Sequence, residues 1–272
     1  MDTRTVPMEV MSRASTKDRL RALYSNLMNW SANHLADGQT AITQRMAEVV
    51  HIPSHQLWGT WPSGVVLERF SPALERRQWP KEGEPICLIY IGSLNYERNL
   101  ESLCQAVEEA NKLGMNFHLS LVGDGSSRRE LEEIVFRMDG CLQVALPVPH
   151  EQVPDLLSQA HVGVLPFPDE IKFRVSSPIK LFEYMGAGLP VMATRIACHV
   201  DVIGDETYAF WAEEASVAGL LAALGDIWKK RACLSMMVQR AFIASRRWTW
   251  RESAEKLKAA LEYGIKKDRC ES

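Results

Sequence analysis

Short apolar segments alternate with segments of helical periodicity from residue 86 onward, and this alternation most constrains the fold. The apolar segments are 86–91, 117–122, 141–146, 162–165 and 190–194, with a possible sixth at 207–211. Strands that are apolar along their whole length need cover on both faces, so the pattern predicts a parallel sheet between helices. The predicted fold class is α/β, with a Rossmann-like parallel sheet and helices on both faces. Ligands of such sheets bind at the carboxyl ends of the strands.

Helical periodicity is predicted at 99–113, 128–138, 151–160, 216–229, 231–246 and 251–263. Before the alternation, an amphipathic helix is predicted at 15–35, with an apolar face of Leu20, Leu23, Tyr24, Leu27 and Trp30. Possible strands at 39–42 and 57–61 flank a helix that begins near Thr43. Residues 1–12 lack periodicity and predict a loose tail. The polar, basic segment 71–80 predicts a hinge or linker.

Composition excludes several classes of function. The net charge of −3 gives no overall basis for binding nucleic acid or an anionic membrane. No segment is long and apolar enough to span a bilayer. The expected location is the cytoplasm, including the inner face of the membrane. The cysteines are scattered without a Cys-x-x-Cys pair, which favours reduced thiols over disulfides or a zinc site. They are Cys87, Cys104, Cys141, Cys198, Cys233 and Cys270.

The segment 176–191 is the strongest candidate for a ligand site. Ser177 can cap a helix whose first position is Pro178. The backbone N–H groups of Ile179 and Lys180 then point outward at the positive end of the helix dipole, where phosphate binds well. Lys180 and Glu183 share a helix face, and a cation beside a carboxylate suits a nucleotide. An ordinary capped helix with a surface ion pair accounts for these residues equally well.

Glycine-bearing turns follow two other predicted strands. Gly92-Ser93 follows the first strand and Gly123-Asp124-Gly125 the second, and Arg98 lies close enough to the first turn to reach a diphosphate. Neither turn matches Gly-x-Gly-x-x-Gly, so a tight strand-to-helix turn and a surface arginine remain open alternatives.

No catalytic residue is assigned. The seven histidines are spread without metal-ligand spacing, and there is no Gly-x-Ser-x-Gly or Walker-type loop. We therefore expect no metal. His150 begins a predicted helix after two prolines, where a capping or solvent role is expected rather than catalysis.

Together, these segments resemble the C-terminal half of a GT-B-fold glycosyltransferase of the family-4 type. Segment 62–72 is similar to the family's hinge, 90–100 to its first nucleotide-domain strand and loop, and 121–125 to its second. Segment 177–191 is similar to the donor-binding helix and the following strand, and Trp248-Thr249-Trp250 is also typical. The likeness covers about residues 37–263 and says nothing about the sugar.

The resemblance implies a donor site for a nucleotide sugar such as a UDP- or GDP-sugar, with no cofactor. Glu183 matches the glutamate that binds the ribose hydroxyls, Arg98 matches the basic residue at the diphosphate, and Ile179 and Lys180 hold the diphosphate through backbone N–H groups. The implied donor-binding set is Gly92, Ser93, Arg98, Gly123, Gly125, Ser177, Ile179, Lys180 and Glu183.

Some positions depart from the family pattern. Val175 stands where the family often has an earlier glutamate, which contacts the donor sugar. Ser93 replaces a usual arginine, so the resemblance implies that the charge facing the diphosphate comes mainly from Arg98, with Lys180 as the second candidate. The asparagine of the hinge is Ser63 here.

The expected organisation has a partial N-terminal, acceptor-side segment with the hinge at 1–72. A donor-binding domain follows at 73–247, and a C-terminal helix at 248–272 crosses back to the N-terminal segment. The expected function is transfer of a sugar to a glycan or lipid-linked acceptor, with retention, in polysaccharide assembly. The alternatives are a truncated or split-subunit nucleotide-sugar-binding module, paired in the latter case with an acceptor-domain subunit, and a non-transferring relative such as an epimerase. We expect segment 15–61 to expose an adhesive apolar face.

Overall fold

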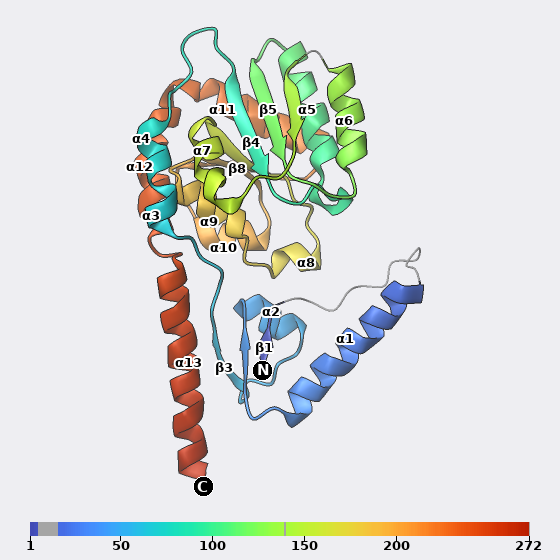
Figure 1. Cartoon of the computed structure of the whole chain (residues 1–272), viewed down its shortest axis with the longest axis vertical. Coiled ribbons are helices and arrows are strands. Elements are labelled where there is room, and N and C mark those ends of the chain that lie inside the picture. The colour runs from blue at the N-terminus through green and yellow to red at the C-terminus, as the bar shows by residue number, and fades with distance from the viewer. Residues whose placement is uncertain (5–15, 139, 272) are drawn as a thin grey trace. The chain divides into compact units, whose positions relative to one another are not determined.

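The structure is a computed structural model that describes residues 1–4, 16–138 and 140–271. The chain forms two compact units (Figure 1). The first comprises Met1–Gly64, Arg174–Ser177 and Trp250–Ser272, and the second comprises Val65–Phe173 and Pro178–Thr249.

The second unit contains a six-stranded, fully parallel sheet in the order β6-β5-β4-β7-β8-β9. The predicted strands are all present, and their bounds are β4 Ile86–Ile91, β5 Phe117–Val122, β6 Leu142–Ala145, β7 Val162–Leu165, β8 Val191–Thr194 and β9 Ala209–Ala212. The predicted α/β fold class with a Rossmann-like parallel sheet is therefore confirmed.

Strand β4 lies at the centre of this sheet. It pairs with β5 from Ile86↔Phe117 to Ile91↔Val122, and with β7 at Leu88↔Val162 and Ile89↔Gly163. The chain thus runs from β4 outward to β6, returns to β7 and runs outward again on the other side. A reversal of strand order of this kind leaves a crevice at the carboxyl ends of the two central strands, where ligands of α/β proteins bind.

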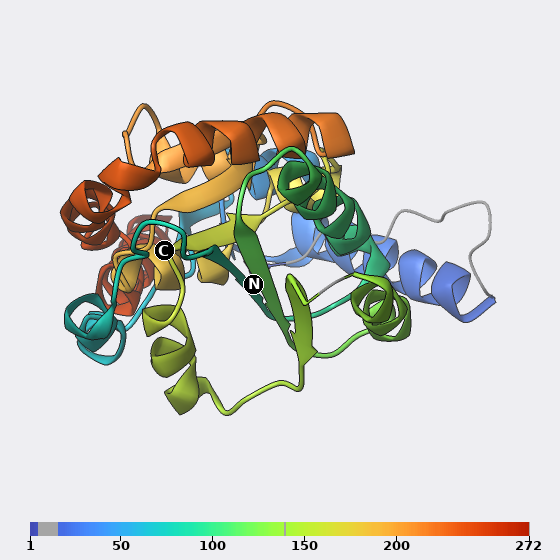
Figure 2. The same ribbon diagram turned by 90° about the horizontal axis from the view of Figure 1, so that it is seen from above.

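Helices cover both faces of the sheet, and Figure 2 shows α5 and α11 together over one face and α7 across the other. Their bounds are α3 Leu67–Phe70, α4 Pro72–Arg76, α5 Leu100–Lys112, α6 Arg128–Arg137, α7 Val153–Ser158, α8 Ile171–Arg174, α9 Ile179–Gly186, α10 Ala197–Ile203, α11 Val217–Lys229 and α12 Leu234–Ser245. Short 3₁₀ turns lie at Tyr96–Arg98 (η1), His150–Gln152 (η2) and Arg231–Cys233 (η3). The sequence did not predict α3, α8 or α10, which have seven residues or fewer and too few turns for a periodic pattern.

The first unit is built on a small parallel sheet in the order β1-β2-β3, comprising Asp2–Thr3, Gln39–Ala41 and Leu57–Thr60. Its helices are α1 Thr16–Leu35, α2 Gln44–Val49 and α13 Trp250–Glu271. Helix α13 packs on β3 so closely that a Cβ placed at Gly59 would lie 2.9 Å from the Ala260 side chain. The predicted loose tail is wrong for Asp2 and Thr3, which pair with β2, and the rest of it, residues 5–12, lies outside the described residues.

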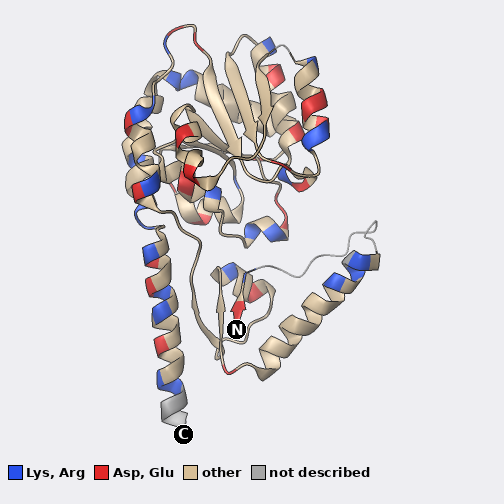
Figure 3. Cartoon of the chain, viewed as in Figure 1, with Lys and Arg blue, Asp and Glu red and all other residues tan. Residues whose placement is uncertain are grey.

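The apolar row of α1 is exposed. Leu20, Leu23, Tyr24, Leu27 and Trp30 each leave between 53% and 67% of their surface accessible. Figure 3 shows that the Lys and Arg residues of this helix lie near its N-terminal end, so the remaining length is largely uncharged. An exposed apolar row of this length is unusual on a finished protein surface.

The segment at 71–80, expected to be a hinge or linker, is anchored instead. Residues Pro72–Arg76 form helix α4, and the Arg77 side chain that follows is buried. Its Nε and two Nη atoms donate to the carbonyls of Leu157, Ala160, Ala187 and Gly188 at 2.8–3.2 Å. Burial lowers the pKa of Arg77 to about 10, which leaves the guanidinium charged at neutral pH. A polar segment with little apolar content is thus held by backbone carbonyls.

The sequence favoured reduced thiols and predicted no segment that spans a membrane. Cys87, Cys104, Cys141, Cys198 and Cys233 are free, while Cys270 lies outside the described side chains. In the part of the chain that the structure describes, no helix has the length and apolarity needed to cross a bilayer.

Replacing Arg77 with Met should lower the free energy of unfolding by about 3 kcal/mol. The guanidinium makes several charge-assisted hydrogen bonds, and its loss leaves buried carbonyls without donors. Urea denaturation of Arg76→Met provides the control, because Arg76 is half exposed and its ion pair with Asp155 should contribute less than about 1 kcal/mol. Equal losses for the two variants would show that the Arg77 hydrogen bonds contribute little.

Candidate functional site

Two glycine turns meet at the carboxyl ends of the neighbouring strands β4 and β5. Gly92 follows β4 with φ 142° and Gly123 follows β5 with φ 154°, a region that L side chains rarely adopt. A Cβ at Gly123 would lie 1.8 Å from the Gly92 carbonyl oxygen, and one at Gly92 would lie 2.0 Å from Lys180 Cε. Glycine is therefore required at both positions, since the two turns and the lysine side chain share one small space.

The two turns are also tied together by hydrogen bonds. The N–H of Leu94 donates to the Asp124 carbonyl at 2.8 Å, and the Ser127 hydroxyl donates to the Leu94 carbonyl at 2.7 Å. A Cβ at Gly125 would meet Asn95 Oδ1 at 2.5 Å, so Gly125 serves the packing of the turns against each other.

Ser93 belongs to the same turn through its backbone. Its carbonyl accepts a hydrogen bond from the Tyr90 hydroxyl at 3.0 Å. Burial raises the pKa of Tyr90, which keeps this hydroxyl protonated and available as a donor.

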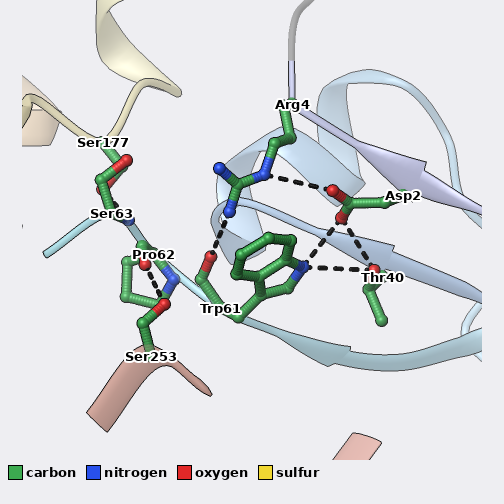
Figure 4. Close-up of polar contacts among 8 residues, drawn as sticks. All are labelled: Asp2, Arg4, Thr40, Trp61, Pro62, Ser63, Ser177 and Ser253. Carbon is green, nitrogen blue, oxygen red and sulfur yellow. Dashed lines mark hydrogen bonds and ion pairs between the residues drawn. The ribbon is translucent and has the colours of Figure 1, made fainter. Parts of the chain in front are cut away.

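Helix α9 begins at Ile179, one residue later than the sequence suggested. Pro178 occupies the N-cap position with an extended backbone and without a side-chain capping bond. The proposed Ser177 cap is therefore wrong: in the first unit the Ser177 hydroxyl accepts from the Ser63 N–H at 2.8 Å (Figure 4). The early N–H groups of α9, including those of Ile179 and Lys180, have no acceptor within the helix because of their position.

Arg98 lies against two aromatic rings. Its guanidinium carbon is 5.1 Å from the ring centroid of Phe167, which follows β7, and 5.1 Å from that of Phe173. The Arg98 Nε atom is buried and has no hydrogen-bond partner. The side chain is thus fixed by packing, and part of its donor capacity is unused.

Lys180 and Arg98 are close enough to interact electrostatically. Burial and, to a lesser extent, the charge of Arg98 lower the pKa of Lys180 to about 8, a net value in which the charge of Glu183 offsets part of the decrease. The Lys180 ammonium also lies 5.8 Å from the ring centroid of Tyr90. Among the described residues, no carboxylate forms an ion pair with either cation. Two unpaired cations beside two glycine turns and a helix N-terminus form an environment that favours an anion.

Glu183 lies one turn further along α9 and is mostly buried. Its Oε1 atom is 2.7 Å from Nε2 of His150, which lies in the turn after β6. The other ring nitrogen of His150, Nδ1, is 2.7 Å from Nη1 of Arg69 in α3. The expected capping or solvent role of His150 is therefore wrong for its ring, which connects a cation to a carboxylate.

The first unit has its own polar cluster at the carboxyl ends of β1 and β3 (Figure 4). The Asp2 Oδ1 atom accepts from Trp61 Nε1 at 2.9 Å and from the Thr40 hydroxyl at 2.8 Å, while Oδ2 accepts from Arg4 Nε at 3.1 Å. The Arg4 guanidinium carbon lies 3.5 Å from the Trp61 ring centroid. These groups satisfy one another's hydrogen-bonding capacity, so the cluster is a structural feature of this sheet.

The structure brings together only some of the donor-binding residues that the sequence predicted. Gly92, Lys180 and Arg98 surround one space, with Glu183 a turn away along α9. Gly125 packs one turn against the other, and Ser177 lies in the first unit. Val175, where the family often has glutamate, is buried in a second apolar cluster with Ile42 and Met46.

The sequence did not indicate that His150 and Arg69 accompany Glu183. These contacts span 33 and 81 residues, and no local pattern marks them. Within the described part of the chain, no group of three or more His, Cys, Asp or Glu side chains is placed to hold a metal ion.

The chain is similar to known glycosyltransferases. The family model described as glycosyl transferases group 1 matches residues 85–230. A curated relative, the 2-deoxystreptamine glucosyltransferase of Streptomyces kanamyceticus, is 27% identical over 232 residues, which cover 78% of this chain and 57% of that protein. The chain thus spans little more than half the length of this relative.

Solved structures share the fold. Sucrose-phosphate synthase of Thermosynechococcus elongatus has a TM-score of 0.74 at 18% identity, covering 98% of this chain and 67% of that one. HepE of Anabaena, in complex with UDP and glucose, has a TM-score of 0.70 at 13% identity over 96% of this chain and 71% of that one. A TarM variant of S. aureus, in complex with fondaparinux, alpha-GlcNAc-glycerol and UDP, has a TM-score of 0.70 at 12% identity, covering 97% of this chain and 50% of that one. At such low identity the likeness shows the fold alone.

Replacing Gly123 with Ala should destabilise the protein by more than about 1–3 kcal/mol, the cost of the backbone conformation alone. The added Cβ also meets the Gly92 carbonyl, which is backbone and cannot rotate away. The control is Gly225→Ala inside α11, where only Met115 Cε lies within 4.0 Å and alanine should stabilise by about 0.5–1 kcal/mol. Urea denaturation of both variants checks this, and an unchanged midpoint for Gly123→Ala would contradict it.

Proposed function

Since the chain belongs to the group 1 family of glycosyl transferases, we propose that it transfers a sugar from a nucleotide-sugar donor to a glycan or lipid-linked acceptor. The matched residues 85–230 include both glycine turns, Arg98 and helix α9. Structures of the same fold, HepE and TarM, contain UDP, which supports a nucleoside diphosphate as the leaving group. Assembly of a surface polysaccharide is our proposal for the setting of this reaction.

The observation that carries this proposal is that two cations, Lys180 and Arg98, lie together where the strand order reverses. Neither forms an ion pair with a carboxylate of the described residues. The donor diphosphate binds between the Gly92 turn, the N-terminus of α9 and the side chains of Lys180 and Arg98. Like charges held close together raise the energy of the unliganded site, and a diphosphate relieves that repulsion. The Glu183 carboxylate binds the ribose hydroxyls as a hydrogen-bond acceptor.

The same groups assist the chemistry. Breaking the bond between the sugar and the diphosphate leaves negative charge on the phosphate oxygens. Fixed cations and backbone N–H groups stabilise that charge without reorganising, which lowers the barrier to departure. We propose that the transfer retains the anomeric configuration, as the resemblance to the family-4 type implies.

A second candidate is a nucleotide-sugar-binding chain without catalysis of its own. The exposed apolar row on α1 favours this candidate, because such a row normally contacts other protein surface. The two candidates share the donor site and differ in turnover. Release of nucleoside diphosphate from the nucleotide sugar in the presence of acceptor distinguishes them.

The donor site predicts a specific ligand response. In a thermal-shift panel of UDP, GDP, ADP and their sugars, at least one nucleotide should raise the melting temperature of the wild type by mass action on the folded state. Glu183→Ala should lose much of that rise, because the ribose hydroxyls lose their acceptor. If no nucleotide at millimolar concentration shifts the wild type, the donor-site proposal is wrong.

A control variant separates site effects from general instability. Glu206 is an exposed carboxylate in the same unit that pairs with Arg247 at the surface, so Glu206→Ala should keep the full ligand-induced shift. A shift lost equally in Glu206→Ala and Glu183→Ala would contradict a specific role for Glu183.

The lowered pKa of Lys180 predicts a pH dependence of diphosphate binding. Lys180 is protonated below about pH 8 and loses its charge above it, whereas a bound diphosphate favours the protonated form. Binding should therefore take up a proton above about pH 8, and affinity should fall as pH rises. The terminal phosphate ionises near pH ~6, so its own charge is constant in this range.

Calorimetric titration between pH 7.5 and 9.5 measures this dependence. Lys180→Arg, whose guanidinium does not titrate there, should bind with an affinity independent of pH. Lys180→Met should bind more weakly at every pH. A wild-type affinity as independent of pH as that of Lys180→Arg would show that Lys180 does not face the diphosphate.

A further inference from the structure

Three side chains from distant parts of the second unit form a continuous hydrogen-bonded row. Arg69 comes from α3, His150 from the turn after β6, and Glu183 from the second turn of α9. Arg69 Nη1 lies 2.7 Å from His150 Nδ1, and His150 Nε2 lies 2.7 Å from Glu183 Oε1. The imidazole ring also packs against Phe70, with ring centroids 5.8 Å apart.

The chemistry of the partners fixes which ring nitrogen carries the proton. A guanidinium has only donors, so His150 Nδ1 must accept from Arg69 and carries no proton in this arrangement. The ring proton is therefore on Nε2, which donates to the Glu183 carboxylate. Arg69 thus selects the tautomer that can hold Glu183.

Exposure differs along the row. The Glu183 side chain is 12% exposed, whereas that of His150 is 50% exposed. The Glu183 carboxylate is therefore the buried end of the hydrogen-bonded row, and the His150 ring contacts it from the solvent side. A buried carboxylate needs hydrogen-bond donors to remain ionised at low cost, and His150 supplies one.

We propose that His150, aligned by Arg69, is a positioning residue that orients the Glu183 carboxylate toward the ribose hydroxyls of the bound nucleotide. This rests on the proposed donor site and adds to it the two residues that prepare its acceptor. A free glutamate side chain samples many rotamers, and fixing it before binding removes an entropic cost from the binding step. The carboxylate has several lone pairs, so the bond to Nε2 leaves acceptor capacity for the ribose.

Paired substitutions test which ring nitrogen matters. The amide nitrogen of glutamine can reach the place of His150 Nε2, whereas the shorter asparagine reaches only that of Nδ1. His150→Gln should therefore keep most of the affinity, and His150→Asn should lose it. Arg69→Met removes the group that selects the tautomer, and Arg69→Lys retains a charged donor there.

The ligands are UDP, GDP and ADP together with their 2′,3′-dideoxy forms, and the measurement uses the nucleotide that binds the wild type. For the ribose form, His150→Asn and Arg69→Met should raise the dissociation constant about 3- to 10-fold. For the dideoxy form, the same variants should change it less than about twofold, because the hydroxyls that Glu183 would bind are missing. A merely structural loss would weaken both ligands equally.

The imidazole provides a second readout that does not depend on ligand. Long-range ¹⁵N–¹H correlation spectra distinguish the two neutral tautomers, and the His150 signal is assigned by its absence in His150→Gln. The wild type should show the proton on Nε2, and Arg69→Met should lose that preference. A proton on Nδ1 in the wild type would overturn the proposal.

The outcomes separate this inference from the proposed function. If no nucleoside diphosphate binds the wild type, both are wrong. If Glu183→Ala weakens binding but the His150 and Arg69 variants match the wild type, the donor site stands and the positioning role is wrong. Tighter binding to His150→Asn would show that the ring obstructs the carboxylate, which also overturns the inference.

Discussion

The pairing of β4 with β5 on one side and with β7 on the other is the constraint on which the second unit depends. Each parallel connection needs a crossover, and right-handed crossovers in opposite directions place helices on opposite faces. The turn after β4 therefore meets the turn after β5 from one side and the start of α9 from the other. Gly92 lies between them, against both the Gly123 turn and the Lys180 side chain.

The close packing around Gly92 explains why two cations lie near each other in the site. Lys180 reaches over Gly92 because no side chain occupies that space, and Arg98 is held against the stacked rings of Phe167 and Phe173. The fold thus holds two cations near each other at a cost that packing and burial elsewhere must offset. Sites that store such repulsion bind the complementary charge strongly, because binding removes it.

The buried Arg77 and the exposed apolar row on α1 show that the polarity of a segment does not by itself predict whether that segment is buried. Segment 71–80 has little apolar content, yet Arg77 fixes its end through backbone carbonyls of α7, of Ala160 just after it, and of the turn after α9. The helix at 16–35 has the periodicity of a buried helix, yet its apolar row remains exposed. Helical periodicity in the sequence indicates that one face of a helix is apolar. Whether other residues cover that face is seen only in the tertiary structure.

The sequence by itself determined the parallel α/β sheet, because strands this apolar are stable only between two layers of helices. It also determined the glycine turns and placed the start of α9 to within one residue, because glycine and proline act on the backbone locally. It could not determine that Ser177 turns to Ser63, or that His150 and Arg69 meet at Glu183. Those contacts join residues 33 to 114 positions apart, so only the tertiary structure decided them.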